Sequence, residues 1–488
     1  MKNLSELLEN IDLIEIINFK NTVIEGISYN SAKIRKDYLF FAIRGTTTDG
    51  NLFIPQAIDN GASTILTDIY PKTIQNGVTY IIVDDARKSM ALIAKKFYNY
   101  HQIKSKIIGV TGTNGKTTIT FLISSILNNL GYKTAVIGTT GIYLNEKKFP
   151  TTNTTPESVL LYELFEKINA LGIDFIIMEV SSHSLVQKRV YGIDFDLAIF
   201  TNLTPDHLDY HKTMDNYAKA KKILFDSLKS NSLAIVNSDD SYSKFMVNDL
   251  SHNQIVMVGT NPNSDYTLKP LKSDIQGIEF ELHNCKSGEK YKVQSKLIGD
   301  FNIYNLALAL VSTSCLGYDL SKLVQTSYKL TTAPGRMEII KLKNGAIGVV
   351  DYAHTPDALE KALKTLINIK NTGKLITVFG CGGDRDSSKR PLMGRIASIL
   401  SDIIIITNDN PRTESPEKII QEILQGIDKS YIHKIHIIPD RRLAIETGVK
   451  YSTNGDIVLV AGKGHEKYQI FGNERIYFDD IEELKKFE

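Results

Sequence analysis

The sequence of 488 residues contains no tryptophan and only three cysteines, Cys285, Cys315 and Cys381. An odd number of cysteines without a paired metal spacing indicates neither a disulfide framework nor a zinc site, and it fits a reducing compartment. An excess of one charge sign is also missing, because 57 Lys and Arg stand against 55 Asp and Glu, for a net charge of +2. This balance excludes a global basic excess that would attract nucleic acid or anionic lipid.

Long apolar runs are missing as well. The first residues carry Glu6, Glu9, Asp12 and Glu15 and no apolar core, so they do not resemble a signal peptide. The longest apolar runs, such as 403–406, have the length of a strand and fall short of the roughly 18 residues that a spanning helix needs. With 42% hydrophobic and 23% charged residues the composition is globular. We therefore expect a soluble, cytoplasmic protein without membrane insertion.

Three segments differ in their predicted elements, which fits about 150 residues per domain. Residues 1–102 alternate short strands and helices, residues 103–333 repeat strand, loop and helix, and residues 334–488 return to that alternation. Continuous apolar runs between helices indicate buried parallel strands, and alternating residues within 250–297 indicate a small antiparallel insertion. Thr155 is expected to cap the following helix, with Pro156 in its first turn. The sequence therefore predicts an α/β fold of three domains.

A glycine-rich turn at 111–118 carries the strongest chemical signal. It follows an apolar strand and precedes a helix, and its glycines are Gly112 and Gly115, whereas strict Walker spacing would place a glycine at Val110. Backbone N–H groups of such a turn bind phosphate together with the helix N-terminus. Lys116 would neutralise the outer phosphates, and Thr117 would offer a hydroxyl to Mg²⁺. A tight turn with an incidental lysine is the alternative, which the strand–loop–helix order disfavours.

Polar residues follow the next buried strands. Glu179 ends one strand and could hold Mg²⁺ directly or through water, although a plain polar strand end is the alternative. The run 204–211 follows another strand with two aspartates and two histidines, including His207. A zinc site is the alternative there, but magnesium and phosphate chemistry already accounts for such residues at a strand end.

Three motifs follow predicted strands of the third segment and should therefore share one edge of its sheet. They are 380–386, 408–414 and 461–466. Arg385 and Arg412 in the first two motifs are suited to bidentate carboxylate binding. Each motif alone is a weak signal, because most such turns and arginines only face solvent, but their coincidence at one edge predicts a binding site.

Together these motifs resemble the Mur ligase family, whose members add amino acids to the cell-wall precursor. In family order the chain carries TGTNGKTT (111–118), TTNTTPES (151–158), EVSSHSL (179–185), TPDHLDYH (204–211), YAKAK (217–221), PGRME (334–338), DYAHTPD (351–357) and GGDRD (382–386). The resemblance covers essentially the whole chain. Within the family, TTNTTP is typical of the ligase for the third peptide residue, and DNPR (409–412) resembles the form that selects meso-diaminopimelate over lysine.

The resemblance implies ATP-dependent amide formation by a uridine-binding α/β domain (1–102), a central P-loop ATPase domain (103–333) and a Rossmann-like amino-acid-binding domain (334–488). It implies Mg²⁺ as cofactor, ATP as co-substrate, no nucleic-acid partner and a monomer. Lys116, His207 and Lys221 would be catalytic, with Lys221 carbamylated, although spacing alone favours a solvated helix lysine. A folylpolyglutamate synthetase-like ligase would lack the long first domain, and a nonenzymatic P-loop switch would not need the arginines of the third.

The resemblance also implies four groups of site residues. ATP would be bound by Gly112, Thr113, Asn114, Gly115, Lys116, Thr117, Thr118, Asn302, Asn305, Arg336 and Asp351. The UDP-muramoyl dipeptide would be bound by Ser31, Asn153, Thr154, Thr155, Ser181, Gln187 and Arg189. Diaminopimelate would be bound by Arg385, Asp409, Asn410, Pro411, Arg412, Gly462 and Glu466, and magnesium by Thr117, Glu179, His207 and Lys221. The chain departs from the family at Asn30-Ser31-Ala32, where Asp-Ser-Arg is usual, and at Asn51, where histidine is common.

Overall fold

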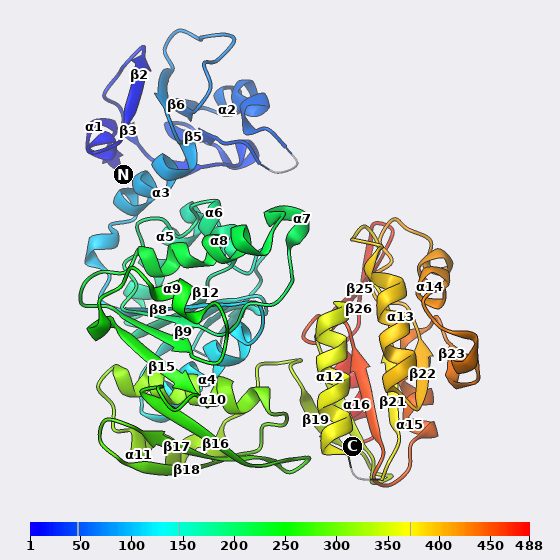
Figure 1. Cartoon of the computed structure of the whole chain (residues 1–488). Helices are drawn as coiled ribbons and strands as arrows, with labels where there is room; N and C mark the ends of the chain where they lie inside the picture. The colour runs from blue at the N-terminus through cyan, green and yellow to red at the C-terminus, as the bar shows by residue number, and fades with distance from the viewer. Residues whose placement is uncertain (46–47, 146, 371) are drawn as a thin grey trace. The chain divides into compact units, whose positions relative to one another are not determined.

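Figure 1 shows the computed structural model of the chain, in which residues 1–45, 48–145, 147–370 and 372–488 are described. The chain forms two compact units. The first comprises Met1–Lys116 and Leu127–Met257, and the second comprises Thr117–Ile126 and Val258–Glu488. Helix α4 (Lys116–Asn129) contributes to both units. The domain boundaries after residues 102 and 333 stay a prediction.

The first unit begins with a five-stranded sheet of order β2-β7-β6-β5-β4. Neighbouring strands are parallel except β2 and β7. The strands are β2 (Leu13–Ile17), β4 (Gly26–Ser28), β5 (Tyr38–Ala42), β6 (Ala62–Thr67) and β7 (Thr79–Val83), and β1 (Lys2–Asn3) pairs separately with β3 (Val23–Ile24). The helices are α1 (Leu4–Leu8), α2 (Ile54–Asp59) and α3 (Ala86–Phe97), with 3-10 turns at Ser31–Lys33, Gly50–Phe53 and Tyr100–Gln102. The predicted alternation of short strands and helices is confirmed.

The rest of the first unit is built on strands in the order β11-β10-β9-β12-β8-β13-β14-β15. Their bounds are β8 (Lys106–Thr111), β9 (Thr134–Gly138), β10 (Gly141–Leu144), β11 (Lys147–Phe149), β12 (Phe175–Glu179), β13 (Leu197–Phe200), β14 (Leu233–Asn237) and β15 (Ile255–Gly259). The helices are α5 (Ser158–Ala170), α6 (Ser182–Val186), α7 (Leu208–His211), α8 (Met214–Asp226) and α9 (Ser243–Val247), with a 3-10 turn at His252–Gln254. Strands β9, β12, β8, β13 and β14 are parallel, so the prediction of parallel strands is confirmed.

The predicted start of helix α5 is wrong. The helix begins at Ser158 with Glu157 at its N-cap position, and Thr155 lies outside it. The Thr155 hydroxyl donates instead to the Glu179 carbonyl oxygen at 2.8 Å and accepts a hydrogen bond from the Ser181 backbone N–H at 3.1 Å. A cap residue must direct its oxygen at its own helix, and this hydroxyl is already committed to the end of β12.

The second unit contains the predicted antiparallel insertion, β16 (Tyr266–Asp274), β17 (Gly277–Asn284) and β18 (Lys290–Ser295). Val258 and Gly259 pair with the start of β16 in parallel. Helices α10 (Phe301–Cys315) and α11 (Leu320–Thr326) follow, with a 3-10 turn at Ser327–Lys329. Helix α10 buries most of its residues, which is expected of a helix that is apolar on nearly all sides.

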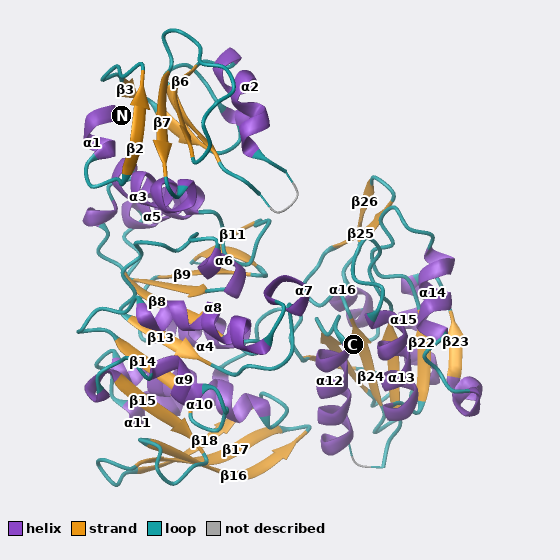
Figure 2. Ribbon diagram, turned by 45° about the horizontal axis from the view of Figure 1, so that its top comes forward, coloured by secondary structure: helices purple, strands orange, loops and turns teal. Residues whose placement is uncertain are grey.

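A six-stranded sheet of order β19-β20-β24-β21-β22-β23 completes the second unit. Its strands are β19 (Glu338–Lys341), β20 (Ile347–Asp351), β21 (Leu375–Phe379), β22 (Ile403–Ile406), β23 (Ile435–Ile437) and β24 (Ile457–Ala461). The other elements are α12 (Pro356–Ile369), α13 (Lys389–Leu400), α14 (Pro416–Leu424), α15 (Arg441–Tyr451), α16 (Asp480–Lys485), a 3-10 helix at Lys429–Lys434 and the hairpin β25 (Tyr468–Phe471) with β26 (Glu474–Tyr477). Helices cover both faces of this sheet (Figure 2). Only β19 is antiparallel, so the carboxyl ends of β21, β22 and β24 share one edge.

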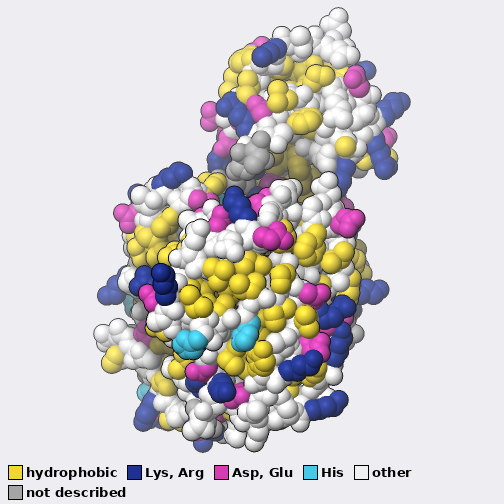
Figure 3. All heavy atoms as spheres, turned by 90° about the vertical axis from the view of Figure 1, so that its right-hand side faces the viewer, with side chains coloured by type: hydrophobic (Ala, Val, Ile, Leu, Met, Phe, Trp, Pro, Cys, Tyr) yellow, Lys and Arg dark blue, Asp and Glu magenta, His cyan; other side chains and the backbone are white. Residues whose placement is uncertain are grey.

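The surface fits the balanced charge of the sequence. On the face drawn in Figure 3, Lys and Arg side chains are interspersed with Asp and Glu. Across the described ranges, no helix is both long and apolar enough to cross a membrane.

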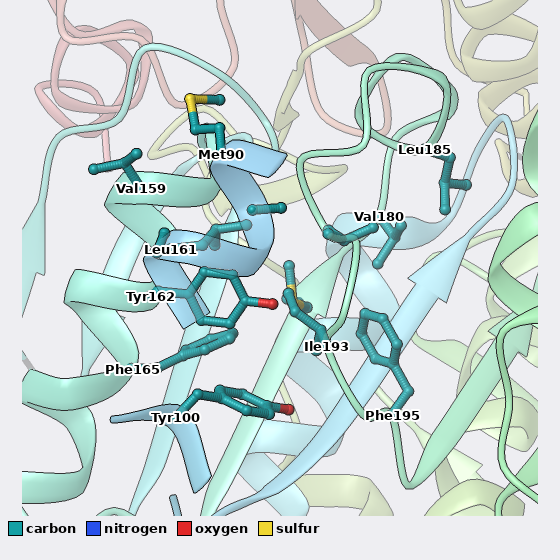
Figure 4. Close-up of a cluster of buried hydrophobic side chains, with 14 of the residues drawn as sticks. Met90, Tyr100, Val159, Leu161, Tyr162, Phe165, Val180, Leu185, Ile193 and Phe195 are labelled. Atoms are coloured by element: carbon teal, nitrogen blue, oxygen red, sulfur yellow. The ribbon is translucent and has the colours of Figure 1, made fainter. Parts of the chain in front are cut away.

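The core of the first unit continues from the first sheet into the second. Figure 4 shows Met90 of α3 near Val159 and Tyr162 of α5, with Tyr100 and Phe165 below them. The Tyr100 and Tyr162 rings meet edge to face with centroids 5.3 Å apart. Helix α3 therefore packs on α5, and this contact joins the sheet of the first hundred residues to the strands that carry the phosphate loop.

Candidate active site

The glycine-rich turn lies between β8 and α4, as the sequence predicts. Gly112 and Gly115 have φ values of 145° and 90°, which suit glycine. A Cβ atom at Gly112 would lie 1.9 Å from Thr201 Oγ1, so a larger residue does not fit there. Lys116 Nζ donates to the carbonyl oxygens of Gly112 and Thr113, both at 2.9 Å. The lysine thus folds back over its own loop, where a phosphate group would meet it.

Lys221 of α8 faces the same loop. The residue is 1% exposed, and its Nζ donates to the Gly112 carbonyl oxygen at 2.8 Å. Burial, and then the nearby Lys116 ammonium, lowers the pKa of Lys221 well below its ordinary value. The reading of Lys221 as a solvated helix lysine is therefore wrong. A depressed pKa provides the neutral amine that carbamylation requires.

Glu179 ends β12 in a fully buried position. Its carboxylate accepts from the Thr139 backbone N–H at 2.8 Å and from the Thr139 hydroxyl at 3.1 Å. The Thr139 hydroxyl also lies 3.0 Å from the Thr154 hydroxyl. A Cβ atom at Gly138 would lie 2.2 Å from the Glu179 carboxylate, so the neighbouring strand leaves room for it only because residue 138 is glycine. The structure therefore connects the predicted metal carboxylate to the predicted dipeptide segment.

His207 immediately precedes the short helix α7, at its N-cap position, with a φ of 54°. Its ring lies 4.9 Å from that of His183, and Asp206 is its acidic neighbour at 3.5 Å. Burial lowers the pKa of His207, and burial together with the neighbouring histidines lowers the pKa of His183 to about 4. These imidazoles are therefore mostly neutral at physiological pH.

The donor set tests the predicted metals. Within the described part of the chain, no three His, Cys, Asp or Glu side chains are arranged to hold a metal, so the zinc alternative gains no support. The Glu179 carboxylate and the Thr117 hydroxyl are hard oxygen donors that suit Mg²⁺. Lys221 would become such a donor only after carbamylation, and His207 is the softest member of the set. The predicted residues fit magnesium through oxygen atoms.

Four residues of the predicted dipeptide group come together. Arg189 Nη1 donates to the Thr155 carbonyl oxygen at 2.9 Å, and its Nη2 donates to Gln187 Oε1 at 2.7 Å. Ser181 is held beside Thr155 by its backbone N–H. Asn153, in contrast, is exposed, and the hydrogen bond found for it among the described residues uses its backbone carbonyl, which accepts from the Thr151 hydroxyl. The structure therefore places the Asn153 side chain in solvent.

Ser31 is buried in the first sheet region, and its hydroxyl donates to Gln56 Oε1 at 2.8 Å. Asn51, the departure from the family pattern, donates to Asp49 at 2.8 Å and accepts from the Thr67 hydroxyl at 2.6 Å. The side-chain amide of Asn51 thus makes hydrogen bonds within the protein at a position where histidine is common in the family.

The remaining nucleotide residues lie in the second unit. Asn302 and Asn305 are buried on α10, with Asn305 Nδ2 donating to Asn302 Oδ1 at 2.9 Å. Arg336 Nη2 donates to the Thr117 hydroxyl at 3.4 Å, and its guanidinium lies over the Tyr352 ring. Burial raises the pKa of Asp351, whose carboxylate accepts from the Met337 backbone N–H at 2.8 Å.

The loops after β21 and β22 pack tightly on each other. The Gly383 N–H donates to the Asn410 carbonyl oxygen at 2.9 Å, and a Cβ atom at Gly383 would lie 1.8 Å from the Pro411 carbonyl oxygen. Arg412 has a φ of 53°, unusual for a residue with a Cβ atom. Its Nη1 donates to the Gly383 carbonyl oxygen at 2.6 Å, and its backbone N–H donates to Ile470. Arg412 is therefore held through both its side chain and its backbone.

The loop after β24 completes this edge. Asn410 Nδ2 donates to Glu466 Oε2 at 2.9 Å. A Cβ atom at Gly462 would lie 2.7 Å from Asp409 Oδ2, so glycine is needed for this approach. Asp409, Asn410, Arg412, Gly462 and Glu466 thus form one cluster, which we call the rim. Arg385 stands apart, because it is exposed and donates to the carbonyl oxygen of its neighbour Asp384 at 3.1 Å.

Three family models match successive parts of the chain: the Mur ligase family catalytic domain at residues 23–98, the Mur ligase middle domain at 110–313 and the Mur ligase glutamate ligase domain at 335–464. The chain belongs to the Mur ligase family. The match confirms the predicted α/β fold of N-terminal, middle and C-terminal domains.

Relatives of this Mur ligase are similar over almost its full length. It is 44% identical to UDP-N-acetylmuramoyl-L-alanyl-D-glutamate–2,6-diaminopimelate ligase 1 of Clostridium acetobutylicum, covering 96% of this chain and 95% of that protein. It is 42% identical to the ligase of that name in Fusobacterium nucleatum, with 94% and 92% covered. A solved structure of such a ligase matches with a TM-score of 0.71 at 36% identity, covering 99% of this chain and 98% of that one.

A more distant structure separates the alternatives. Folylpolyglutamate synthase of Thermotoga maritima matches at 18% identity with a TM-score of 0.61, and it covers only 78% of this chain. At that identity the match shows the fold alone. The folylpolyglutamate alternative is therefore a distant relative, as the long first segment of this Mur ligase predicts.

Sequence reasoning missed two residues that shape the site. Arg390 is fully buried and donates to the Gly382 carbonyl oxygen at 3.1 Å and to Glu414 at 2.9 Å, which positions the loop after β21. Glu157 accepts from Arg189 at 2.9 Å and lies 3.4 Å from Arg87 of α3. The run Lys389-Arg390-Pro391, which follows shortly after the 380–386 motif, was the available signal for Arg390. Nothing in the local sequence indicates that Glu157 pairs with two arginines far away in the chain.

Proposed function

We propose that this Mur ligase joins meso-2,6-diaminopimelate to UDP-N-acetylmuramoyl-L-alanyl-D-glutamate at the expense of ATP, in peptidoglycan precursor synthesis. Full-length similarity to ligases named for this reaction supports the proposal. The observation that carries the choice of amino acid is the rim, where Arg412 is held with part of its guanidinium still available. Its Nη1 donates to Gly383, and no protein partner of its other side-chain nitrogen atoms is found among the described residues.

The proposed reaction has two steps. The D-Glu carboxylate of the dipeptide attacks the γ-phosphoryl group of ATP in line, which gives an acyl phosphate and ADP. The amine of diaminopimelate then attacks the acyl carbon and expels phosphate, and the amine proton is released. Both steps depend on positioning and on charge neutralisation more than on covalent catalysis. Lys116 is suited to neutralise the developing phosphate charge, because it already lies over the loop that would cradle it.

Mg²⁺, when bound, would neutralise phosphate charge that the lysines do not reach. In the proposal Glu179 and Thr117 hold it, together with His207 and the carbamate of Lys221. The neutral amine of Lys221 adds to CO₂ and loses a proton, which converts a buried neutral group into a buried carbamate anion. This change is favourable here because Lys116 lies close enough to lower the pKa of Lys221.

The substrates occupy separate regions in the proposal. The ATP phosphates bind at Gly112, Thr113, Asn114, Gly115, Lys116, Thr117 and Thr118, with Asn302, Asn305, Arg336 and Asp351 on the nucleoside side. The UDP-muramoyl dipeptide binds at Ser31, Asn153, Thr154, Thr155, Ser181, Gln187 and Arg189. Diaminopimelate binds at the rim with Arg385 and Pro411. The domain boundaries at 102 and 333, a monomeric state and a cytoplasmic location stay predictions.

The test is release of phosphate from ATP by the purified protein. We expect release that requires both UDP-N-acetylmuramoyl-L-alanyl-D-glutamate and meso-diaminopimelate, with the tripeptide product identified by mass. L-lysine in place of diaminopimelate should give little product. Product formation with lysine, or with folate and glutamate instead, would contradict the proposed substrates.

A further inference from the structure

The loop after β24 contains a lysine to which the proposed chemistry gives no role. Lys463 follows Gly462, and its side chain is 0% exposed. Lysine is almost never fully buried unless it is paired, because removing an ammonium from water is costly. The side chain therefore needs partners close by.

Its hydrogen-bond and ion-pair partners belong to the rim. Lys463 Nζ donates to Asn410 Oδ1 at 3.1 Å and to Glu466 Oε2 at 3.2 Å, and it lies 3.7 Å from Asp409 Oδ1. An ammonium has three N–H donors and no acceptor. Two hydrogen bonds and the Asp409 ion pair hold this one, which also lies 5.2 Å from the centroid of the Tyr468 ring. Because the Lys463 side chain is 0% exposed, it does not contact a ligand itself, and its effect on a ligand passes through these polar side chains.

The two carboxylate oxygens of Glu466 have different surroundings. Its Oε2 accepts from both Asn410 Nδ2 at 2.9 Å and Lys463 Nζ at 3.2 Å. For Oε1 the described residues offer no partner. One oxygen of the carboxylate is thus fixed from two directions, and the other is left to accept a donor from outside.

The charged side chains that pair with Lys463 favour a cation as that donor. Lys463 contributes one positive charge, and Asp409 and Glu466 contribute two negative charges, so the three side chains carry a surplus of one negative charge. A ligand ammonium beside Glu466 would balance this surplus.

We propose that Lys463 is a positioning residue for the amino-acid substrate: it holds Glu466 and Asn410 so that Glu466 Oε1 accepts a hydrogen bond from an ammonium group of the incoming amino acid. The inference rests on the proposed function, because it takes the rim to be the amino-acid site. Asn410, assigned to diaminopimelate from the sequence, acts in this arrangement through Glu466, since its side-chain amide is engaged by Lys463, Glu466 and the Ile470 backbone N–H.

The test compares Lys463→Met, Glu466→Gln and the double variant with the wild type. Methionine keeps most of the side-chain volume and removes the charge. We expect Lys463→Met to raise the KM for diaminopimelate about 10- to 100-fold, the range reported for loss of groups that orient metal ligands. The KM values for ATP and the UDP-dipeptide, and the kcat at saturating diaminopimelate, should stay unchanged. Lys467→Met is the matched control, because Lys467 lies in the same loop but pairs at the surface with Asp479 and Glu482.

The double variant makes the outcome decisive. It removes one charge of each sign and so keeps the net charge of the cluster, which protects it against misfolding if Lys463→Met alone does not fold. If Lys463 acts through Glu466, the double variant has the diaminopimelate KM of Glu466→Gln alone. Additive losses, equal losses for all three substrates, or an unchanged KM in Lys463→Met would overturn the inference. A wild-type protein that does not use diaminopimelate at all would instead refute the proposed function.

Discussion

Replacing Arg412 by alanine tests the amino-acid pocket most directly. Meso-diaminopimelate carries a carboxylate on its distal carbon that L-lysine lacks, and a guanidinium is suited to bind it through two hydrogen bonds. The structure presents Arg412 half-buried, with Nη1 engaged by Gly383. Arg412→Ala should therefore lower kcat/KM for diaminopimelate and leave the low value for lysine unchanged.

The size of the expected loss in kcat/KM follows from the partial exposure of Arg412. A fully buried charge pair would cost about 3–5 kcal/mol to break, but water reaches Arg412 and screens it. A hydrogen bond to a charged group is then worth about 1.5–3 kcal/mol. At about 1.4 kcal/mol for each factor of ten, the expected loss is about 10- to 150-fold. The left-handed backbone does not confound this value, because alanine and arginine both carry a Cβ atom at a φ of 53°.

The assay is phosphate release at several concentrations of each amino acid. Arg395→Ala is the control, because Arg395 is an exposed arginine of α13 outside the rim. Equal use of lysine and diaminopimelate by the wild type would refute the reasoning. So would a variant that keeps the preference, or one that loses activity with both amino acids alike.

Three further predictions concern Lys116, Lys221 and Glu414. Lys116→Ala should abolish phosphate release while the thermal unfolding curve stays that of the wild type, because the loss removes charge stabilisation and not packing; turnover in a folded variant would contradict the nucleotide site. Lys221→Ala should lose activity and regain part of it with added acetate or formate, which replace the carbamate oxygens; failure of every short carboxylate to restore turnover would count against carbamylation. A hydrogen bond from Arg390 lowers the pKa of Glu414 from 4.5 to about 2, so its stabilisation is fully present above the ordinary pKa and is lost as the pH falls toward 2. Glu414→Gln should therefore lower the free energy of unfolding, measured in urea, at neutral pH. Between neutral pH and about pH 3 the free energy of unfolding should fall less in the variant than in the wild type. An equal fall in both proteins would show that this pair is not responsible.

Much of the site could be predicted from local sequence. Glycines at 112 and 115 between an apolar strand and a helix predict a phosphate loop, because few other structures need that order of residues. The motifs at 380–386, 408–414 and 461–466 follow strands, and parallel strands end at one edge, so the meeting of these loops at one edge of the sheet was predictable from topology.

Other features of the site depend on long-range packing. Lys221 and Lys222 are neighbours on one helix, and spacing does not tell them apart. Burial alone would lower the pKa of Lys222, yet hydrogen bonds to Asp226 and Asp249 raise it. Lys221 turns toward the Gly112 carbonyl, where burial and Lys116 lower its pKa.

Contacts between residues distant in the sequence also determine other features that the motifs do not predict. Sequence motifs by themselves determined the family resemblance, the phosphate loop and the set of strands whose ends carry polar residues. Only the tertiary structure showed that Thr155 binds the end of β12 and caps no helix, and that Lys463 holds Glu466 from within the core. Each of these facts depends on a partner distant in the sequence, and burial, which sets the cost of an unpaired polar group, is a property of the packed chain.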